Sequence, residues 1–423
     1  MKKSALHNYI SRRQVRLQTE QVPVSGRTGM IVVIPCYDEP DLLVTLESLC
    51  NAVRPACAVE VIVVVNASDT TPESVLEQNE KTCKEVELFA RRVNSDSFKV
   101  ILMQVVCRPL KYAGVGLARK TGMDEAVARL DCIGLEDGVI VSLDADCTVA
   151  PDYFTELERI LLTDRRASVA TIHFQHTLPQ KDSAAYEAMV QYELYLRYYK
   201  QALRFAGFPY AYYTIGSAFA VKATAYCRCG GMGKYQSGED FYFLQKVFQQ
   251  GGIRELNTTT VYPSSRLSDR VPFGTGPSLI KMVSEDKHVR KFSYALESFL
   301  VLKSVFQKRD AWYAQGGNMT EKESSDYFTN GIPLPLAVYL EKNNFVESMM
   351  ELRANCAGAE VFSKRFFDWY NGLRVLQSLN VLQESYPLRP VTEETRRLIK
   401  LLGKPDVTTD TSLGLLEYMR TCY

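Results

Sequence analysis

The chain has 423 residues, with 50 lysines and arginines against 49 aspartates and glutamates. This length is enough to bury a sizeable core and to form one large α/β domain with an appended module, or two domains. Because the charges balance, no global field draws the chain onto nucleic acid or anionic lipid. Any charged ligand must therefore be bound by a local group of side chains.

The N-terminus and the cysteines indicate the compartment. The first 21 residues are basic but contain no apolar signal region. No stretch of the sequence approaches the about 20 apolar residues that a membrane span needs. The 11 cysteines are odd in number and lack the regular spacing of a secreted disulfide scaffold. We expect a cytoplasmic protein with reduced thiols and no transmembrane segment, for which peripheral membrane contact stays open.

Strand and helix patterns alternate in the first third of the chain. Short β-branched runs predict strands at residues 30–34, 59–65, 99–106 and 139–143. Amphipathic stretches between them predict helices at residues 41–53, 73–93 and 115–130. This alternation is typical of an α/β fold class with a mostly parallel sheet and helices on both faces. Because parallel strands end at one edge of a sheet, we expect the polar loops after these four runs to converge on one crevice.

The pattern changes after Pro151, which ends the segment that follows the fourth predicted strand. We predict a helix start at Thr148–Pro151, then a helix at 153–163, a strand at 168–174, an aromatic helix at 184–205, a strand at 214–221 and a helix at 241–250. Beyond about residue 277 only helical periodicity is visible, as at 294–307 and 362–379. The predicted organisation is an N-terminal extension (1–28), an α/β domain (29–276) and a helical C-terminal module (277–423).

Asp144 and Asp146 end the fourth predicted strand, one residue apart. Two hard carboxylate oxygen donors on one turn suit Mg²⁺ or Mn²⁺, and such an ion can neutralise a nucleotide diphosphate. An ordinary polar turn is the alternative, and the pair alone does not decide between the two. Its position on the converging edge of the predicted sheet favours the metal site.

Basic residues follow the third predicted strand. The segment Gly114-Val-Gly-Leu-Ala-Arg-Lys-Thr-Gly122 is not a dinucleotide fingerprint, because it does not follow the first strand and Arg119 stands where a third glycine would be. Arg119, Lys120 and the nearby Lys111 either face phosphate or belong to a solvated helix surface. Both interpretations stay open for each residue.

Two further groups carry candidate chemistry. Glu239 and Asp240 open a predicted helix, where a carboxylate is either a helix cap or a general base for an attacking hydroxyl. Arg266 and Arg270 lie in a loop rich in glycine, proline and serine, where they either grip a diphosphate or remain solvated. For His173, His176 and His288, a structural role is favoured over metal binding.

Four motifs, taken in chain order, make the chain similar to the GT-A glycosyltransferases, specifically glycosyltransferase family 2. Ile31-Val-Val-Ile-Pro-Cys-Tyr-Asp-Glu39 resembles the family's first strand and loop, and Val63-Val-Val-Asn-Ala-Ser-Asp69 resembles its second-strand nucleotide loop. Asp144-Ala-Asp146 matches the metal motif, and Gly238-Glu-Asp240 matches the acceptor-side motif that supplies the base in inverting members. The resemblance covers about residues 29–276.

The resemblance implies roles for individual residues. Asp146 would bind Mn²⁺ or Mg²⁺, Asp144 would contact the ion or the ribose, and Asp240, with Glu239 beside it, would be the catalytic base. Gly216 and Ser217 resemble the acceptor-site segment. Together with the two loop arginines, the residues expected around the nucleotide sugar are Pro35, Tyr37, Glu39, Asn66, Asp69, Lys111, Arg119, Asp144, Arg266 and Arg270.

We predict a metal-dependent glycosyltransferase that moves a single sugar, with inversion, from a nucleotide-diphosphate sugar to a hydroxyl acceptor. The acceptor would be a glycan, a lipid-linked molecule or a small molecule of cell-surface glycan or glycoconjugate synthesis. The sequence lacks the Gln-x-x-Arg-Trp element and the membrane spans of processive synthases. Asn66, where the family usually has aspartate, leaves uracil and guanine open as the base.

Three alternatives remain open. A retaining GT-A glycosyltransferase and a sugar nucleotidyltransferase share the predicted architecture. The nucleotidyltransferase lacks support, because its glycine-rich basic loop is missing from Pro35-Cys-Tyr-Asp-Glu-Pro40. A non-catalytic nucleotide-sugar-binding protein is the third, against which the presence of both acidic motifs argues.

Overall fold

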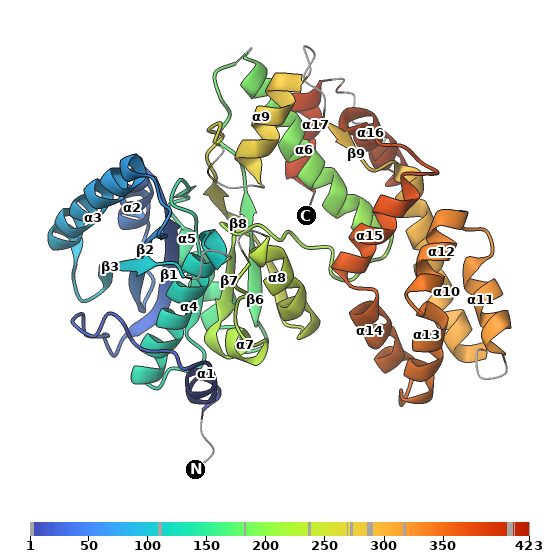
Figure 1. The fold of residues 1–423 in the computed structure, drawn as a ribbon, viewed down its shortest axis with the longest axis horizontal. Coiled ribbons are helices and arrows are strands. Elements are labelled where there is room, and N and C mark those ends of the chain that lie inside the picture. The colour runs from blue at the N-terminus through green and yellow to red at the C-terminus, as the bar shows by residue number, and fades with distance from the viewer. Residues whose placement is uncertain are drawn as a thin grey trace. The chain divides into compact units, whose positions relative to one another are not determined.

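A computed structural model describes residues 4–108, 112–181, 183–235, 238–268, 270, 274–285, 291–315, 319–403, 409 and 411–422. The chain forms two compact units. The first unit comprises residues 1–179 and 214–280, and the second comprises residues 180–213 and 281–423. Figure 1 labels most of their helices and strands.

The first unit is built on an eight-stranded sheet with the order β3-β2-β1-β4-β7-β6-β8-β5. Its strands are β1 (Thr28–Cys36), β2 (Ala58–Ala67), β3 (Phe98–Val106), β4 (Val139–Ser142), β5 (Thr148–Val149), β6 (Val169–Phe174), β7 (Phe219–Lys222) and β8 (Ile253–Tyr262). The neighbours β3, β2, β1 and β4 are parallel, β6 and β8 are parallel, and β7 and β5 run antiparallel to their neighbours. The four predicted strands are confirmed, and their carboxyl ends share one edge of the sheet, as expected.

Apolar residues explain why these central strands form. Every residue of β1 is buried, as are the first nine of β2, because a sheet covered on both faces favours continuous β-branched runs over alternation. Helices α2 (Leu42–Asn51), α3 (Glu73–Val93) and α4 (Val115–Cys132) connect the parallel strands. Right-handed connections put α2 and α3 on one face and α4 on the other, because α4 crosses back from β3 to β4. The predicted α/β fold class is confirmed.

Several elements differ from the sequence-based prediction. Residues 148–149, expected to begin a helix, form β5, which pairs with β8. Neither β8 nor the N-terminal helix α1 (Ala5–Arg13) was predicted. The helix expected at residues 153–163 is α5 (Tyr153–Leu157) followed by a π-helical turn over Glu158–Leu162. The strand expected from residue 214 begins only at Phe219. Helices α7 (Ala223–Arg228) and α8 (Glu239–Gln249) complete the first unit's later part.

The second unit is mainly helical, as predicted for the C-terminal part of the chain. Its helices include α6 (Ala184–Phe205), α10 (Leu296–Gln315), α11 (Glu321–Thr329), α12 (Leu334–Lys342), α13 (Phe345–Ala354), α14 (Ala359–Trp369), α15 (Gly372–Leu382), α16 (Val391–Leu401) and α17 (Ser412–Arg420). Strands β9 (Phe292–Ser293) and β10 (Arg389–Pro390) form a two-stranded sheet. Helix α9 (Thr275–Glu285) spans the boundary between the two units. The single helix expected at residues 362–379 is broken at Asn371, whose side chain caps α15.

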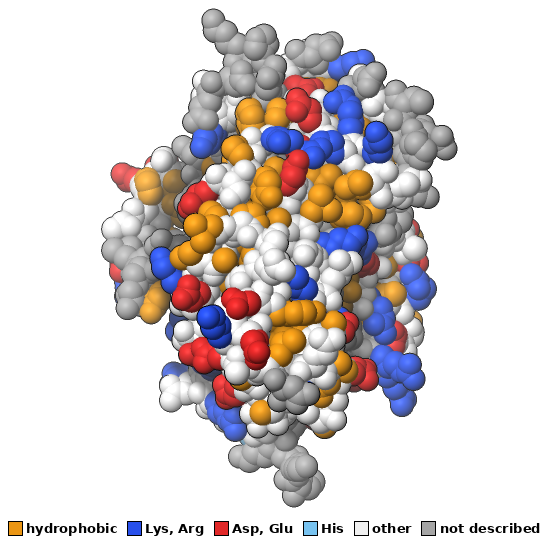
Figure 2. Space-filling view, turned by 90° about the vertical axis from the view of Figure 1, so that its right-hand side faces the viewer, with side chains coloured by type: hydrophobic (Ala, Val, Ile, Leu, Met, Phe, Trp, Pro, Cys, Tyr) orange, Lys and Arg blue, Asp and Glu red, His pale blue; other side chains and the backbone are white. Residues whose placement is uncertain are grey.

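Helix α6 joins residues from the middle of the chain to the C-terminal helices. It packs against α10, α16 and α17, and the fully buried Glu193 binds Arg420 of α17 at 2.8 Å. The domain boundary expected after residue 276 stays a prediction. In the structure, the packing of α6 groups residues 180–213 with the C-terminal helices. Figure 2 shows acidic and basic side chains interspersed over one face, with small groups of apolar side chains between them.

No helix among the described residues is both long and apolar enough to cross a membrane.

Candidate functional site

The ends of β1 and β2 form the first part of the site. Pro35 is buried on β1, and Asp38 in the loop after it takes a left-handed backbone conformation with φ of 50°. Asn79 of α3 joins the two strand ends, because its Nδ2 donates to the carbonyl of Asn66 at 3.0 Å and its Oδ1 accepts from the Asp38 amide at 3.0 Å. Sequence reasoning missed Asn79. Its signal is an amide on the otherwise mostly apolar buried side of α3.

Asn66 and Asp69 have different surroundings. Asn66 is 5% exposed, and its Oδ1 atom has no hydrogen-bond partner among the described residues. A buried acceptor without a partner is costly, so this atom is suited to receive a ligand N–H. Asp69 is half-exposed and binds the Arg108 guanidinium through contacts of 2.7 and 3.0 Å. Lys111, also predicted for this side of the site, lies outside the described residues.

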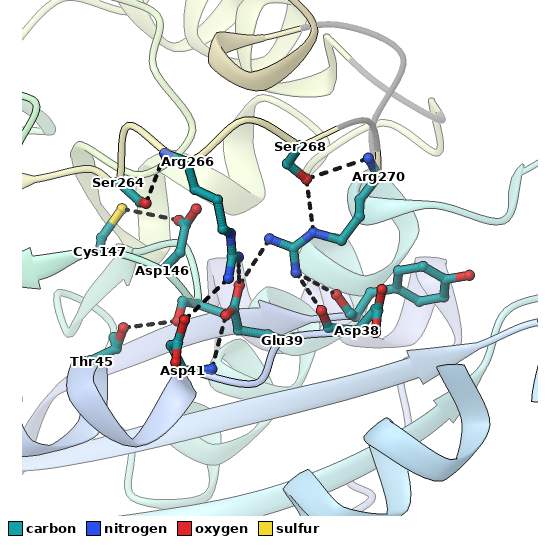
Figure 3. Close-up of polar contacts among 12 residues, drawn as sticks. Asp38, Glu39, Asp41, Thr45, Asp146, Cys147, Ser264, Arg266, Ser268 and Arg270 are labelled. Atoms are coloured by element: carbon teal, nitrogen blue, oxygen red, sulfur yellow. Dashed lines mark hydrogen bonds and ion pairs between the residues drawn. The ribbon is translucent and has the colours of Figure 1, made fainter. Parts of the chain in front are cut away.

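Glu39 gathers the two arginines of the loop after β8 (Figure 3). Its Oε2 atom accepts from Arg266 at 2.5 Å and from Arg270 at 3.0 Å, and its Oε1 accepts from the Asp41 amide at 3.0 Å. Arg270 also donates to the carbonyls of Tyr37 and Asp38 at 3.2 and 2.5 Å. Burial raises the pKa of Glu39, but the Arg266 hydrogen bond, the Asp41 amide and the Arg270 charge outweigh it and lower the pKa below the ordinary value.

The turn between β4 and β5 carries Asp144 and Asp146. Thr45 of α2 fixes this turn, because its hydroxyl donates to the carbonyl of Ala145 at 2.8 Å. Asp146 forms no ion pair with any described residue, although the nearby charges of Arg270 and Arg266 act on it. Burial, followed by the charges of Asp144 and Glu39, raises the pKa of Asp146 to about 6. The turn therefore holds excess negative charge.

Arg119 of α4 connects Asp144 to the start of α8. Its Nη2 atom lies 2.5 Å from Asp144 Oδ1, and its Nη1 atom pairs with Glu239. The side chains of Arg119 and Glu239 are 4% and 2% exposed, whereas Asp144 is 38% exposed. Glu239 is thus a buried ion-pair partner, and it has no free access to an acceptor hydroxyl.

Asp240 lies next to this ion-pair group. Its Oδ1 atom accepts from the Phe241 amide at 2.7 Å, and the backbone of Gly216 also hydrogen-bonds to it. Burial raises the pKa of Asp240, against the lowering effect of the Arg119 charge and the two amides. A carboxylate with a raised pKa is a better proton acceptor at neutral pH than an ordinary aspartate. Of the two acidic residues at the start of α8, Asp240 is the one suited to be a base.

The acceptor-side segment lies before β7. The Ser142 hydroxyl of β4 donates to the Gly216 carbonyl at 2.6 Å, which fixes this glycine beside Asp240. Ser217 is buried and hydrogen-bonds to the Cys147 thiol. Sequence reasoning did not single out Ser142, because nothing local in a buried strand marks a contact to a residue 74 positions away.

The donor set for a metal consists of few protein groups. Among the described residues, no group of three or more histidine, cysteine, aspartate or glutamate side chains could hold a metal ion. His173 contacts Gln175, His176 contacts Thr275, and His288 lies outside the described residues. Mg²⁺ usually takes one or two protein carboxylates and completes its shell with water and substrate phosphate. Asp144 and Asp146 fit such a shared site, and burial and the charges of Asp144 and Glu39 together raise the pKa of Asp146 despite the two nearby arginines.

The structure thus brings most of the predicted residues to one edge of the sheet. Arg119, Asp144, Glu239, Asp240 and Gly216 are linked by direct contacts. Glu39, Arg266 and Arg270 form a second linked group whose charges act on Asp146. The Asp144–Asp146 turn therefore connects the two groups, with one aspartate facing each.

Comparison with known proteins gives a match to one family model and a set of similar solved structures. Residues 31–226 match the family model described as glycosyl transferase family 2. No curated protein matches the chain. Among solved structures, S. aureus TarS 1-349 in complex with UDP-GlcNAc has 13% identity and a TM-score of 0.40, over 80% of this chain and 89% of that chain.

Two other similar structures come from Mycobacterium tuberculosis and Pyrobaculum calidifontis. Glucosyl-3-phosphoglycerate synthase from Mycobacterium tuberculosis, in complex with Mg²⁺ and UDP, has 13% identity and a TM-score of 0.32, over 66% of this chain and 81% of that chain. A mannosyltransferase from Pyrobaculum calidifontis, in complex with GDP-Man and Mn²⁺, has 12% identity and a TM-score of 0.32, over 99% of this chain and 93% of that chain.

Proposed function

We propose that this chain, whose residues 31–226 match the model of glycosyl transferase family 2, moves one sugar from a nucleotide-diphosphate sugar to a hydroxyl acceptor with inversion. The proposal includes Mn²⁺ or Mg²⁺ shared between the Asp144–Asp146 turn and the donor diphosphate. The proposed acceptors are hydroxyl groups of cell-surface glycans and glycoconjugates.

One observation carries the proposal. The guanidinium of Arg119 contacts both Asp144, from the predicted metal motif, and Glu239, the neighbour of the predicted base. The side of the site that would hold the diphosphate and the side that would hold the acceptor are therefore separated by a single side chain. Sugar transfer needs this proximity, because the acceptor oxygen and the leaving phosphate must both reach one anomeric carbon.

The chain's residues support a single displacement. Asp240 takes the proton from the acceptor hydroxyl as the acceptor oxygen forms a bond to the anomeric carbon. The bond from that carbon to the phosphate oxygen breaks, and its electron pair leaves with the nucleoside diphosphate. One base is enough, because no covalent intermediate has to be resolved. The raised pKa of Asp240 suits this role.

Negative charge develops on the departing diphosphate, and preorganised cations stabilise it. Glu39 holds Arg266 and Arg270 by contacts of 2.5 and 3.0 Å, near enough to Asp146 for their charges to lower its pKa. When bound, a divalent ion supplies further charge stabilisation at the phosphate oxygens. The Asn66 Oδ1, which has no hydrogen-bond partner among the described residues, would accept from the base, whose ring N–H is the complementary donor in both uracil and guanine.

The experiment is a comparison of the native chain with Asp240→Asn and Asp146→Ala. UDP-sugars and GDP-sugars are first screened for thermal stabilisation with and without Mn²⁺, because a ligand that binds only the folded state raises its stability. Donor binding is then measured by calorimetry, and sugar transfer by product analysis. The anomeric configuration of the product is read by NMR, and retention would exclude the single displacement.

Asp240→Asn is expected to bind the donor about as the native chain does and to lose transfer by about 10²–10⁴-fold, the usual contribution of a general base. Asp146→Ala is expected to lose the Mn²⁺-dependent part of donor binding. Normal turnover by the asparagine variant would contradict the assigned base, and unchanged Mn²⁺ dependence in the alanine variant would contradict the metal site. Donor binding without transfer or hydrolysis by the native chain would favour a non-catalytic binding protein.

A further inference from the structure

Arg119 is the most enclosed cation of the site. It lies in the first turns of α4, and its side chain is 4% exposed. One terminal nitrogen contacts Asp144 at 2.5 Å and the other pairs with Glu239. The third nitrogen, Nε, is buried and has no hydrogen-bond partner among the described residues. Sequence reasoning expected this side chain near the base or phosphates of the donor.

The backbone is closely fitted around this ion-pair group. A β-carbon at Gly216 would lie 2.9 Å from Arg119 Nη2 and 3.1 Å from Asp240 Oδ2. A β-carbon at Gly116, one turn before Arg119, would lie 3.1 Å from Cγ of Glu239 and would collide with the Tyr235 carbonyl. At these two positions only glycine leaves enough space for the guanidinium and its carboxylate partners. This arrangement fixes the side chains and leaves little space for a phosphate between them.

The electrostatics lead to the same conclusion. A guanidinium is planar and binds two carboxylates through separate nitrogens, whereas an ammonium is a compact point charge. The single positive charge of Arg119 is shared by its ion pairs with Asp144 and Glu239. The same charge also lowers the pKa of Asp240. With its terminal nitrogens committed to carboxylates, Arg119 is already neutralised. Arg266 and Arg270 are better placed to bind a diphosphate, because the two arginines share one carboxylate, that of Glu39.

We propose that Arg119 is a positioning residue that holds the Asp144 turn and the Glu239–Asp240 pair at a fixed separation, and that it is not a ligand of the diphosphate. This inference rests on the proposed function for its catalytic meaning. The turn between β4 and β5 and the start of α8 are far apart in the sequence, and the Arg119 side chain contacts both. If they move apart, Asp240 loses its place relative to the reacting carbon, and a small misplacement is enough to slow a transfer strongly.

The test uses Arg119→Lys and Arg119→Gln, with Arg129→Lys as a matched control. Arg129 is also on α4 and fully buried, and it binds Glu60 at 2.7 and 3.1 Å at the opposite end of the sheet. Both Arg119 variants are expected to lower kcat at least about 100-fold while KM for the donor and the Kd for UDP or GDP change less than about threefold, as expected when alignment in the transition state is lost and donor binding is not. Lysine does not rescue, because it cannot bridge two carboxylates. Arg129→Lys is expected to lose Tm and to keep kcat.

Two results would overturn the proposal. An increase of about tenfold or more in the nucleotide Kd, with kcat maintained, would identify Arg119 as a diphosphate ligand, since a lost charged hydrogen bond has that effect. An equal loss of kcat in Arg129→Lys would show that the loss in the Arg119 variants comes from general destabilisation of the fold.

A Tm cycle separates this inference from the proposed function. Arg119→Gln leaves Glu239 buried without a counter-charge, so its Tm falls, and adding Glu239→Gln is expected to restore most of it without restoring kcat. If the native chain neither binds a nucleotide diphosphate nor transfers sugar, the proposed function fails, but the cycle still decides on Arg119. An unchanged Tm in Arg119→Gln would then overturn the positioning role.

Discussion

Glu39 shows how one buried carboxylate organises residues that are remote in the sequence. It is 2% exposed and receives both Arg266 and Arg270, which lie more than 200 positions later. The sequence predicted each of these residues for the nucleotide side of the site, but it contains no signal that they bind one another. Because Arg270 also donates to the carbonyls of Tyr37 and Asp38, the loop after β1 is held by the same contacts.

This arrangement predicts a specific pH dependence of stability. The pKa of Glu39 is below its ordinary value of 4.5 in the folded chain, so its contribution is complete above about pH 5 and is lost as pH falls through the lowered pKa. At neutral pH, Glu39→Gln is expected to lower the free energy of unfolding by about 1.5–3 kcal/mol, the range for hydrogen bonds to charged groups. Urea unfolding at pH 3 to 7 should show that this difference narrows towards acid. A difference that is constant over that range would contradict the assignment.

Helix α4 is the element that connects core packing to the site, since it carries Gly122 as well as Arg119. A β-carbon at Gly122 would lie 2.5 Å from Val33 Cγ1 and 2.7 Å from Val64 Cγ2, so the helix approaches β1 and β2 too closely for any side chain. Gly122→Ala is expected to lower the free energy of unfolding by about 1–3 kcal/mol through overpacking, although alanine favours helix by about 1 kcal/mol. Gly358→Ala, with no atom within 4 Å of the added carbon, is the control. A urea midpoint that is unchanged or raised in Gly122→Ala would contradict the close approach.

The elements also show which structure the sequence can predict. Strands β1 and β2 are buried along nearly their whole length, and their continuous β-branched runs made them predictable. Strand β8 was missed because Ile253–Tyr262 is polar and only three of its residues are buried, and its conformation depends on pairing with β6. The acidic site motifs were predictable because their chemistry is local. Asn79, Ser142 and the Glu39 contacts were not, because they are long-range hydrogen bonds.

At the scale of the whole molecule, the two units are not two consecutive segments of the chain. Residues 180–213 leave the first unit, contribute α6 to the second and are followed by the rest of the first unit. Helix α6 buries Leu194, Tyr198 and Leu203, and Tyr198 donates to the carbonyl of Tyr294 at 3.0 Å. Its stability as a helix therefore depends on partners that are synthesised about a hundred residues later.

This connectivity predicts opposite behaviour for two truncated chains. A chain ending at residue 280 keeps α6 but loses α10, α16 and α17, so the apolar side of α6 is exposed and Glu193 loses its contact with Arg420. We expect this chain to bind a hydrophobic dye and to aggregate, since exposed apolar patches of this kind promote association. The second chain joins residues 1–179 to residues 214–280 by a flexible linker and therefore lacks α6 as well. We expect it to stay soluble and to unfold cooperatively. Dye binding, light scattering and thermal unfolding compare the two chains. If the chain ending at residue 280 is soluble and binds no dye, α6 does not need the C-terminal helices, and the second unit is not a cooperative one.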